Sequence, residues 1–272
     1  KQKTAYEIYQ CDWSSDVCSS DLGGRFLLRV EDIDLTRCRP EYEAALYEDL
    51  GWLGLGWEAP VRRQSDHFDD YRAALQSLID RGLAYRCFKT RKEVLDEIAG
   101  APHGPGEAYR GAPLPTDEEA RRLDEGQPYA WRLSLDRARE ALGVDWDALS
   151  FLEEGEGPNG EVGRIAARPE TAGDVILARK DVGVAYHLAV THDDALQGIT
   201  HVIRGQDLFE ASHIQRLIQV LMGWPAPTYR HHRLLTGPDG KRYAKRDRAE
   251  TLRDLRARGV TAEQVKAELG FA

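Results

Sequence analysis

The chain has 272 residues, of which 42% are hydrophobic and 31% charged, and it carries a formal net charge of −9. This length fits one large α/β domain with an insertion, or two modest domains. The sequence has no run near the ~20 apolar residues of a membrane span, and its N-terminus lacks the apolar core of a signal peptide. The acidic balance argues against a general nucleic-acid coat protein, although a local basic stripe can still bind phosphate. The four cysteines are unevenly spaced, so we expect no disulfide framework and a cytoplasmic protein.

Residues 1–22 look foreign to the rest of the chain. The half from Cys11 to Leu22 is rich in serine and aspartate and shows neither helical nor strand periodicity, so we expect a loop or a disordered segment. Cys11 and Cys18 do not have the spacing of metal ligands. The segment resembles translated junction sequence more than a natural N-terminus.

A strand followed by an acidic turn begins the regular part of the chain. The apolar run of residues 25–30 predicts a buried strand, and Glu31, Asp32 and Asp34 follow it directly. Carboxylates at the end of a sheet strand lie where open α/β sheets bind ligands. The alternative is an acidic loop in which Asp34 or Thr36 caps the next helix.

The following part of the chain alternates helices and strands. The predicted elements are helices over 40–50 and 66–81, a strand over 83–88, a Gly- and Pro-rich surface loop over 100–115, and strands over 129–135 and 146–152. The pairs Thr90/Glu93 and Thr116/Glu119 have the spacing of capping boxes, which open helices. The last two strands indicate a smaller, mostly antiparallel insertion.

A phenol and a guanidinium come close together in the second half of the chain. The pattern predicts a strand over 174–180, a helix over 186–195 and a strand over 199–203. We expect Tyr186 and Arg204 to face one pocket at the rim of the sheet, a pair that suits a ligand carboxylate. In the alternative interpretation, Arg204 ends a buried strand and pairs with Asp207.

The C-terminal part carries a basic loop between helices. The pattern predicts a helix over 211–222, a basic strand over 230–235, and helices over 251–258 and 262–269. Between them, a turn at residues 237–240 precedes the run R-Y-A-K-R of residues 242–246. A flexible basic loop before a helix can neutralise a triphosphate as charge moves to the departing pyrophosphate.

Three blocks of the chain, taken in order, resemble the glutamyl class I aminoacyl-tRNA synthetases. They are R-V-E-D-I-D-L-T-R at residues 29–37, Tyr186…D-D-A…G-I-T-H-V-I-R-G…D-L at 186–208, and R-Y-A-K-R at 242–246, a variant of the family's K-M-S-K-S loop. The similarity runs from about Gly23 to about Phe271. It implies an α/β fold: a Rossmann-like class I catalytic domain with a parallel sheet and an inserted α+β subdomain that meets the acceptor end of tRNA.

The resemblance divides the chain into five segments. They are the foreign segment 1–22, an incomplete first part of the nucleotide-binding fold at 23–85, the insertion at 86–172, the second half of the nucleotide-binding fold at 173–235, and the basic loop with the C-terminal helices at 236–272.

The resemblance also implies roles for single residues. Glu31 contacts the ammonium of glutamate, Arg204 binds a carboxylate, and Tyr186 adds a hydrogen bond. Lys245 is the catalytic residue and binds the ATP phosphates together with Arg242, while Mg²⁺ bridges these phosphates. The free carboxylate attacks the α-phosphorus of ATP in line, so positioning and charge stabilisation supply the catalysis.

Within this family the chain is closest to truncated members that attach glutamate to the queuosine base in the anticodon of tRNA(Asp). The chain stops soon after the R-Y-A-K-R loop, which leaves no anticodon-binding domain, and it has Val190 where the tRNA-charging members usually have Asn. We therefore expect a monomeric ligase with glutamate, ATP and queuosine-bearing tRNA(Asp) as partners. The alternatives are a truncated glutamyl- or glutaminyl-tRNA synthetase, which charges a 3′ end, and a non-catalytic paralogue that binds RNA or an amino acid.

The family's H-I-G-H signature is missing from the sequence. None of the eight histidines has that pattern, and residues 1–22 stand where its strand, its histidines and a substrate-contacting Arg and Ser would lie. We expect the sheet to lack a central parallel strand and to leave neighbouring apolar side chains under-packed. We also expect weak or absent activity, since such a histidine pair stabilises the transferring phosphoryl group.

Many of the queuosine-directed members hold zinc through a C-x-C pair, a tyrosine and a further cysteine. This chain has Cys87 followed by Phe88 and Lys89, and no cysteine follows Tyr109. One thiol and one phenol do not make up the ligand set of a structural zinc site, so we expect no zinc. We expect Cys87 to be a small buried apolar residue.

Overall fold

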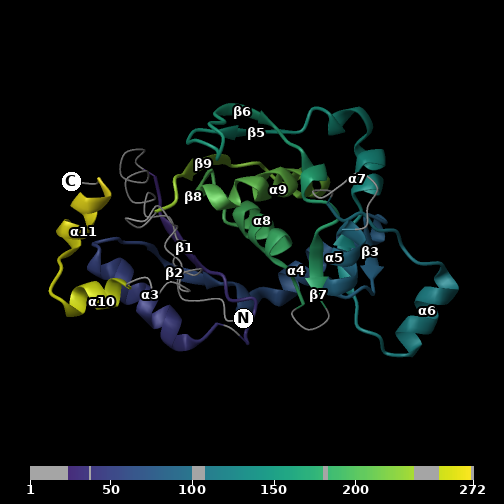
Figure 1. Ribbon diagram of the computed structural model, residues 1–272, viewed down its shortest axis with the longest axis horizontal. Coiled ribbons are helices and arrows are strands. Elements are labelled where there is room, and N and C mark those ends of the chain that lie inside the picture. Colours follow the sequence, from purple (N-terminus) through teal and green to yellow (C-terminus); the bar gives the residue numbers. More distant parts are fainter. Residues whose placement is uncertain (1–23, 37, 100–107, 180–182, 236–250, 271–272) are drawn as a thin grey trace. The chain divides into compact units, whose positions relative to one another are not determined.

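The structure is a computed structural model that describes residues 24–36, 38–99, 108–179, 183–235 and 251–270 (Figure 1). The chain divides into two compact units. Unit 1 is made of Lys1–Ser65, Ile203–Gly205 and Arg233–Ala272, and unit 2 of Asp66–Val202 and Gln206–His232. Within the described ranges, no helix is long and apolar enough to cross a membrane.

In its described residues, unit 1 combines a pair of parallel strands with three α-helices and the end of β8 (His201–Gly205). Its elements are β1 (Leu27–Val30), α3 (Pro40–Trp52), β2 (Glu58–Arg63), α10 (Leu252–Ala257) and α11 (Ala262–Leu269). β1 and β2 are parallel, with Val30 opposite Arg63, and among the described strands they form a sheet of their own. The strand predicted over 25–30 and the helix predicted over 40–50 are confirmed, whereas the missing central strand stays a prediction.

Helix α3 supplies two of the six residues in the buried cluster of unit 1. Leu46 and Leu50, about one helical turn apart, belong to the same buried cluster as Leu28 of β1. Ala262 of α11 is part of this cluster and Leu252 of α10 packs against it, so both terminal helices contribute to the core. The sequence predicts both of these helices, and in the structure each begins with a capping box.

Unit 2 contains the remaining elements. Its helices are α4 (Phe68–Asp80), α5 (Arg91–Ala99), α6 (Thr116–Asp124), α7 (Leu135–Leu142), α8 (Tyr186–Leu196) and α9 (Phe209–Met222). Its strands are β3 (Ala84–Cys87), β4 (Ala130–Leu133), β5 (Ser150–Glu153), β6 (Gly163–Ala166), β7 (Ile176–Arg179), β9 (Thr228–His232) and the start of β8 (His201–Gly205). Short 3-10 helices are η1 (Gln64–His67), which begins in unit 1, η2 (Gly143–Trp146), η3 (Pro169–Thr171) and η4 (Gln206–Leu208).

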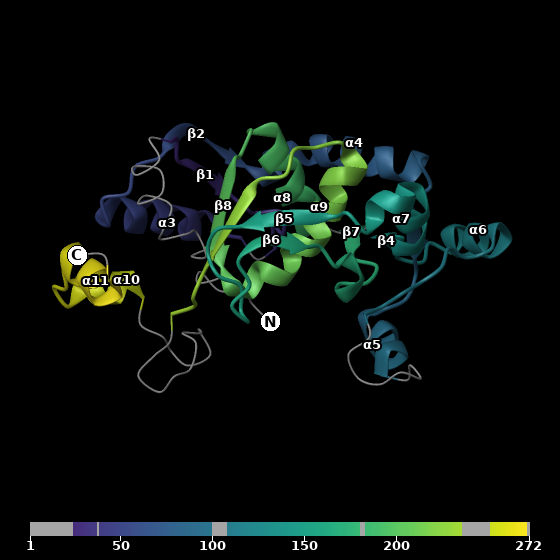
Figure 2. The same cartoon turned by 90° about the horizontal axis from the view of Figure 1, so that it is seen from above.

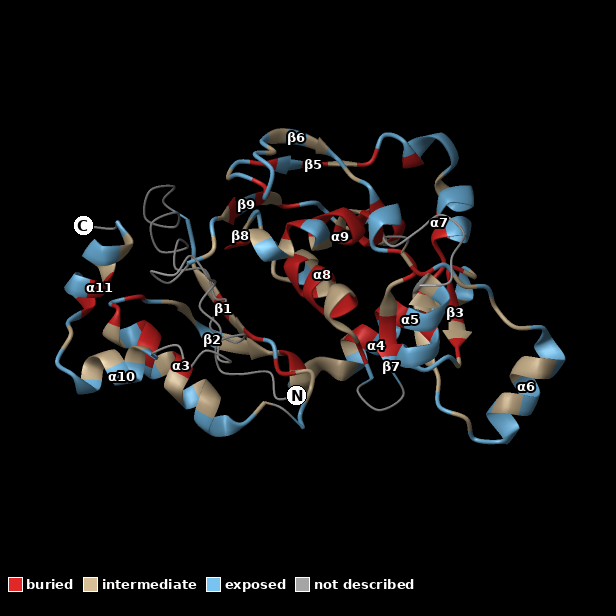
Figure 3. Ribbon diagram, viewed as in Figure 1, coloured by how far each residue is buried: buried red, intermediate tan, exposed pale blue. Residues whose placement is uncertain are grey.

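Apart from β1 and β2, the described strands form two sheets (Figure 2). The first has the order β3-β4-β7, and both of its strand pairs are antiparallel. Of the two strands predicted for the insertion, 129–135 contains β4 of this sheet, whereas 146–152 overlaps β5 of the other sheet, so the antiparallel insertion with its boundaries at 85/86 and 172/173 stays a prediction. The second has the order β6-β5-β9-β8, in which β5 is antiparallel to β6 and parallel to β9. Helix α9 packs against β5, and α8 contacts both α9 and α4. Helices α8 and α9 carry many buried residues, whereas α6 has none (Figure 3).

The structure departs from the predicted elements in several places. The sequence patterns do not predict β2, α7 or β6. The residues of β2, E-A-P-V-R-R, show no alternation of apolar side chains, so this strand depends on its pairing with β1. The strand predicted over 146–152 begins only at Ser150, because Trp146 still belongs to η2 and a turn follows it.

One of the two predicted capping boxes is confirmed. The Thr90 amide donates to the Glu93 carboxylate at 2.6 Å, and the Glu93 amide donates to the Thr90 hydroxyl at 3.3 Å. The box at Thr116 and Glu119 is wrong, because α6 begins directly after Pro115 without a side-chain cap. Glu119 instead forms an ion pair with Arg86 of β3, which connects α6 to the first sheet.

His213 makes the core of unit 2 sensitive to pH. It is fully buried, its ring lies 5.2 Å from that of Phe151, and its Nδ1 accepts a hydrogen bond of 3.1 Å from the Arg168 amide. Burial lowers the pKa of His213 below its ordinary value of 6.5. Protonation therefore favours the unfolded chain, and the stability that neutral His213 contributes is present above this value and is lost as the pH falls below it.

We expect the free energy of unfolding in urea to fall between pH about 7.5 and pH about 5, and to fall less in His213→Asn, whose side chain does not titrate. The difference between the two pH slopes isolates His213 from the other titrating groups. Equal slopes in both proteins would contradict the assignment.

Candidate active site

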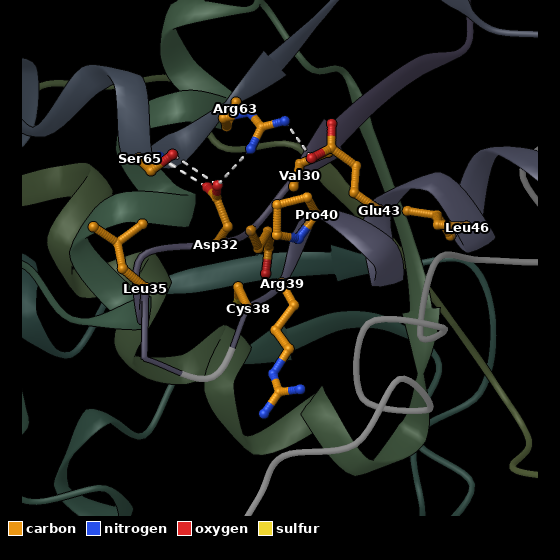
Figure 4. A pocket seen from close by; sticks show the side chains of 11 residues that line it. Val30, Asp32, Leu35, Cys38, Arg39, Pro40, Glu43, Leu46, Arg63 and Ser65 are labelled. Atoms are coloured by element: carbon orange, nitrogen blue, oxygen red, sulfur yellow. Dashed lines mark hydrogen bonds and ion pairs between the residues drawn. The ribbon is translucent and has the colours of Figure 1, made fainter.

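A cavity of about 200 Å³ lies in unit 1 at the carboxyl ends of β1 and β2 (Figure 4). The residues that line it come from these strand ends, from the turn after β1 and from the first turns of α3: Val30, Glu31, Asp32, Leu35, Cys38, Arg39, Pro40, Glu43, Leu46, Arg63 and Ser65. This edge of a parallel sheet is where open α/β folds bind ligands, as the acidic turn predicts.

Glu31 reaches this cavity from the residue directly after β1. Its side chain is 40% exposed, and its Oε1 lies 3.5 Å from Nη2 of Arg29. Residues two apart in an extended chain project to the same side, so Arg29 lies on the side of β1 on which Glu31 emerges. The carboxylate is therefore accessible to a cationic group of a ligand while it contacts one internal cation.

Asp32 differs sharply from its neighbour. It is only 5% exposed, and its oxygens accept hydrogen bonds from the Ser65 amide at 2.8 Å and the Ser65 hydroxyl at 2.7 Å. Nη1 of Arg63 lies 3.4 Å from the same carboxylate, so three donors converge on it (Figure 4). Asp32 thus connects the end of β1 with the end of β2 and with Ser65 after it, whereas the Glu31 carboxylate stays accessible at the cavity.

Arg63 extends this network to α3. Its second terminal nitrogen donates to Glu43, whose other oxygen accepts a hydrogen bond of 2.8 Å from the Tyr47 hydroxyl. Burial, together with the hydrogen bond to Glu43, raises the pKa of Tyr47 to about 12. Tyr47 consequently stays a proton donor across the physiological range, and it holds Glu43 toward Arg63.

The helix-cap alternative for the acidic turn is wrong. Asp34 accepts hydrogen bonds from the amide and the hydroxyl of Thr36, at 3.2 and 2.6 Å, and so closes a local turn. Helix α3 starts at Pro40, and no side chain caps it.

Tyr186 and Arg204 lie in different units. Tyr186 is the first residue of α8 in unit 2 and is half-buried. A hydrogen bond of 2.7 Å from the Tyr71 hydroxyl to buried Asp193 ties α8 to α4. Arg204 belongs to unit 1, is 5% exposed, and is not among the residues that line the cavity of that unit. The meeting of Glu31, Tyr186 and Arg204 around one ligand stays a prediction.

The two predicted ATP-binding residues, Arg242 and Lys245, fall outside the described residues. The same is true of the R-Y-A-K-R loop that contains them. Their roles stay predictions from the family resemblance.

Two of the residues considered as zinc ligands do lie together. Sγ of Cys87 is 3.6 Å from the Tyr109 hydroxyl, and Cys87 is buried, as expected. Nζ of Lys89 lies 5.6 Å and the Arg132 guanidinium 4.6 Å from the centre of the Tyr109 ring. Across the described part of the chain, no group of three or more His, Cys, Asp or Glu side chains could hold a metal ion.

No sequence pattern marks Arg63, Ser65 and Glu43 as part of this site. Arg63 and Ser65 follow a strand that has no recognisable pattern, and Glu43 has the appearance of a solvent-exposed helical residue. The spacing of Asp32 and Ser65, 33 positions apart, gives no local signal of their contact.

Comparison with known proteins identifies the fold. Residues 17–266 match the sequence profile of the tRNA synthetases class I (E and Q), catalytic domain. This match begins inside the segment 1–22, before the start expected at about Gly23. The chain is 28% identical to a glutamate-tRNA synthetase structure from Elizabethkingia anophelis, with a TM-score of 0.67, over 85% of this chain and 48% of that one.

Curated relatives agree with the profile. The glutamyl-Q tRNA(Asp) synthetase of Rhodobacter capsulatus is 44% identical over 92% of this chain and 89% of its own length. The corresponding protein of Nocardia farcinica is 40% identical over 91% and 73%, respectively. The glutamate–tRNA ligase of Prochlorococcus marinus is 36% identical over 89% of this chain, which spans 50% of that ligase. The chain therefore belongs to the class I tRNA synthetases for glutamate and glutamine, and residues 17–266 correspond to their catalytic domain.

Proposed function

We propose that this protein activates glutamate with ATP and transfers the glutamyl group to the queuosine base in the anticodon of tRNA(Asp). The observation that carries the proposal is the 44% identity to a glutamyl-Q tRNA(Asp) synthetase over 89% of that protein's length. By contrast, the chain spans about half of the glutamate–tRNA ligases that it matches. We assign glutamate and tRNA(Asp) as substrates because the names of these relatives contain them.

In the proposed reaction, the protein positions three charged groups of free glutamate. Glu31 contacts the ammonium, and the accessibility of its carboxylate at the cavity supports this role. Arg204 binds a carboxylate with a hydrogen bond from Tyr186, a task for which a planar guanidinium is well suited. The remaining carboxylate attacks the α-phosphorus of ATP, and pyrophosphate leaves. The chain supplies orientation and charge stabilisation instead of a nucleophile.

Lys245 and Arg242 bind the ATP phosphates in this proposal, and Mg²⁺ accompanies the nucleotide. The described residues offer no cluster of carboxylates for a metal ion, and the Asp32 carboxylate is already occupied by Ser65 and Arg63. The Mg²⁺ ion would therefore be held through oxygens of ATP. We further propose that the protein acts as a monomer in the cytoplasm.

The second candidate is glutamylation of a tRNA 3′ end. It is favoured by the structural similarity to glutamate-tRNA synthetase and by the 36% identity to the Prochlorococcus marinus ligase. Both candidates share the activation step and differ only in the acceptor.

Transfer of labelled glutamate separates these candidates. We expect label on tRNA(Asp) that contains queuosine, none on tRNA(Asp) that contains guanosine at that position, and retention of the label after the 3′ end is removed. Enzyme in excess over tRNA makes a slow single turnover visible. Label on the 3′ end of tRNA(Glu) would support the second candidate, and label on neither tRNA by a chain that binds glutamate would support a non-catalytic paralogue.

We expect the purified protein to contain no stoichiometric zinc. Lys89 occupies the place where the family pattern has a second thiol, and its ammonium, which forms an ion pair with Glu97, has no lone pair to offer a Zn²⁺ ion. Elemental analysis of protein expressed with added zinc tests this, with Lys89→Cys as the matched variant that regains a thiol. One zinc ion per wild-type chain would contradict the expectation.

A further inference from the structure

The acidic turn after β1 contains two adjacent carboxylates with opposite surroundings. Both residues line the cavity, but the Glu31 side chain is 40% exposed, whereas Asp32 is buried and accepts hydrogen bonds from three donors. An ionised carboxylate is purely an acceptor, so its oxygens match these donors well. Asp32 is thus fully engaged within the protein, and its role differs from that of Glu31.

The donors to Asp32 all come from the end of the neighbouring strand. Arg63 is the last residue of β2 and lies opposite Val30, and Ser65 follows two residues later. The two strands leave the sheet side by side, and the Asp32 side chain replaces the ladder hydrogen bonds beyond that point. The backbone that carries Glu31 is consequently fixed between the β1–β2 ladder on one side and the Asp32 contacts on the other.

The network also includes the helix that forms another wall of the cavity. Arg63 contacts Asp32 and Glu43 at once, and Tyr47 secures Glu43. These side chains converge as drawn in Figure 4, where Arg63 lies between the two carboxylates. The end of the strand, the turn and the helix, which together line the cavity, are therefore held in one arrangement by these side chains.

We infer that Asp32 is a positioning residue that sets the direction of the Glu31 carboxylate toward the ammonium of the amino-acid substrate. The inference rests on the proposed role of Glu31. Glu31 has a flexible side chain with an internal partner, Arg29, at 3.5 Å, so its orientation depends on where its backbone is held. A displacement of ~1 Å at a binding group is enough to cost about 10²-fold in a well-oriented site.

The test compares glutamate with glutarate, which has the same two carboxylates and no ammonium. Ligand-observed NMR titration of the full chain gives the affinity for each, and their ratio reports the Glu31–ammonium contact. We expect Asp32→Asn to lower this ratio about 10-fold, since an amide nitrogen in place of an oxygen opposes the donors of Ser65 or Arg63. Asp34→Asn is the matched control: it removes a charge from the same turn, and we expect a ratio close to that of the wild type.

A second, milder variant keeps the test valid if Asp32→Asn does not fold. Ser65→Ala removes only the 2.7 Å hydrogen bond from the hydroxyl and keeps the amide donor, so we expect a reduction of about 3-fold in the ratio at an unchanged unfolding temperature. A general loss of folded protein lowers both affinities together and leaves the ratio unchanged.

The outcomes are distinguishable. The positioning role is overturned if the glutamate-to-glutarate affinity ratio falls in Glu31→Gln but equals that of the wild type in folded Asp32→Asn and in Ser65→Ala. The proposed function is intact in that case. A wild-type ratio in Glu31→Gln itself overturns the assignment of Glu31 and the inference with it. Failure of the wild-type chain to bind glutamate at all contradicts the proposed function.

Discussion

A chimera in which the N-terminal segment of the Rhodobacter capsulatus relative replaces residues 1–22 is expected to exchange pyrophosphate into ATP about 10³-fold faster than the 272-residue polypeptide. The sequence lacks the H-I-G-H signature, whose histidines, by the family resemblance, stabilise the transferring phosphoryl group. Loss of a single preorganised donor to a developing charge typically costs about 10²- to 10³-fold. The grafted segment would also restore a strand to the sheet, so we expect a higher unfolding temperature.

The control for this experiment separates chemistry from folding. We expect the grafted segment to carry the H-I-G-H signature of the family. Alanine in place of the two histidines of that signature should keep the gain in unfolding temperature and remove most of the gain in exchange. Exchange by the 272-residue polypeptide at the rate of the chimera would refute the proposed impairment. Equal exchange by the chimera with and without its histidines would refute the assigned role of the signature.

Arg204→Lys is expected to weaken glutamate binding about 100-fold, which corresponds to about 3 kcal/mol. A guanidinium donates two parallel hydrogen bonds to a carboxylate, whereas an ammonium acts as a point charge on a flexible chain. The side chain is 5% exposed, so the bond to a ligand would form in a poorly hydrated place, where it is strong.

Arg216→Lys provides the matched control for this substitution. Arg216 of α9 is also partly buried, and its Nε donates to the Ser150 carbonyl at 2.8 Å. We expect this variant to unfold at a lower temperature and to bind glutamate like the wild type. If Arg204→Lys also loses only stability and keeps its glutamate affinity, Arg204 is an internal ion-pair partner, as the alternative with Asp207 has it.

Helices with a regular apolar period could be predicted from the sequence, whereas strands that depend on their neighbours could not. The apolar residues of α4 and α9 recur at helical spacing, and both helices are present within two residues of the predicted ends. β2 has a proline and three charged residues among its six, and nothing in it indicates a strand until β1 lies beside it. β6 begins at a glycine and is paired only along one side, with β5, among the described strands.

The candidate site shows the same division. The position of Glu31 after an apolar strand predicts a ligand-facing carboxylate, and the structure places it at a cavity. The sequence does not distinguish Glu31 from Asp32, because burial of one and exposure of the other depend on Ser65 and Arg63, which lie more than 30 positions away. The difference between the exposed Glu31 and the buried Asp32 can therefore be seen only in the folded structure, where β2 pairs with β1.

The most direct test of the proposed chemistry is a crystal structure of the protein with bound glutamate. We expect the ammonium of glutamate within hydrogen-bonding distance of Glu31. We expect one carboxylate of glutamate to accept hydrogen bonds from both Arg204 and Tyr186. Glutamate bound elsewhere, or those three groups pointing into separate regions of the molecule, would contradict the account.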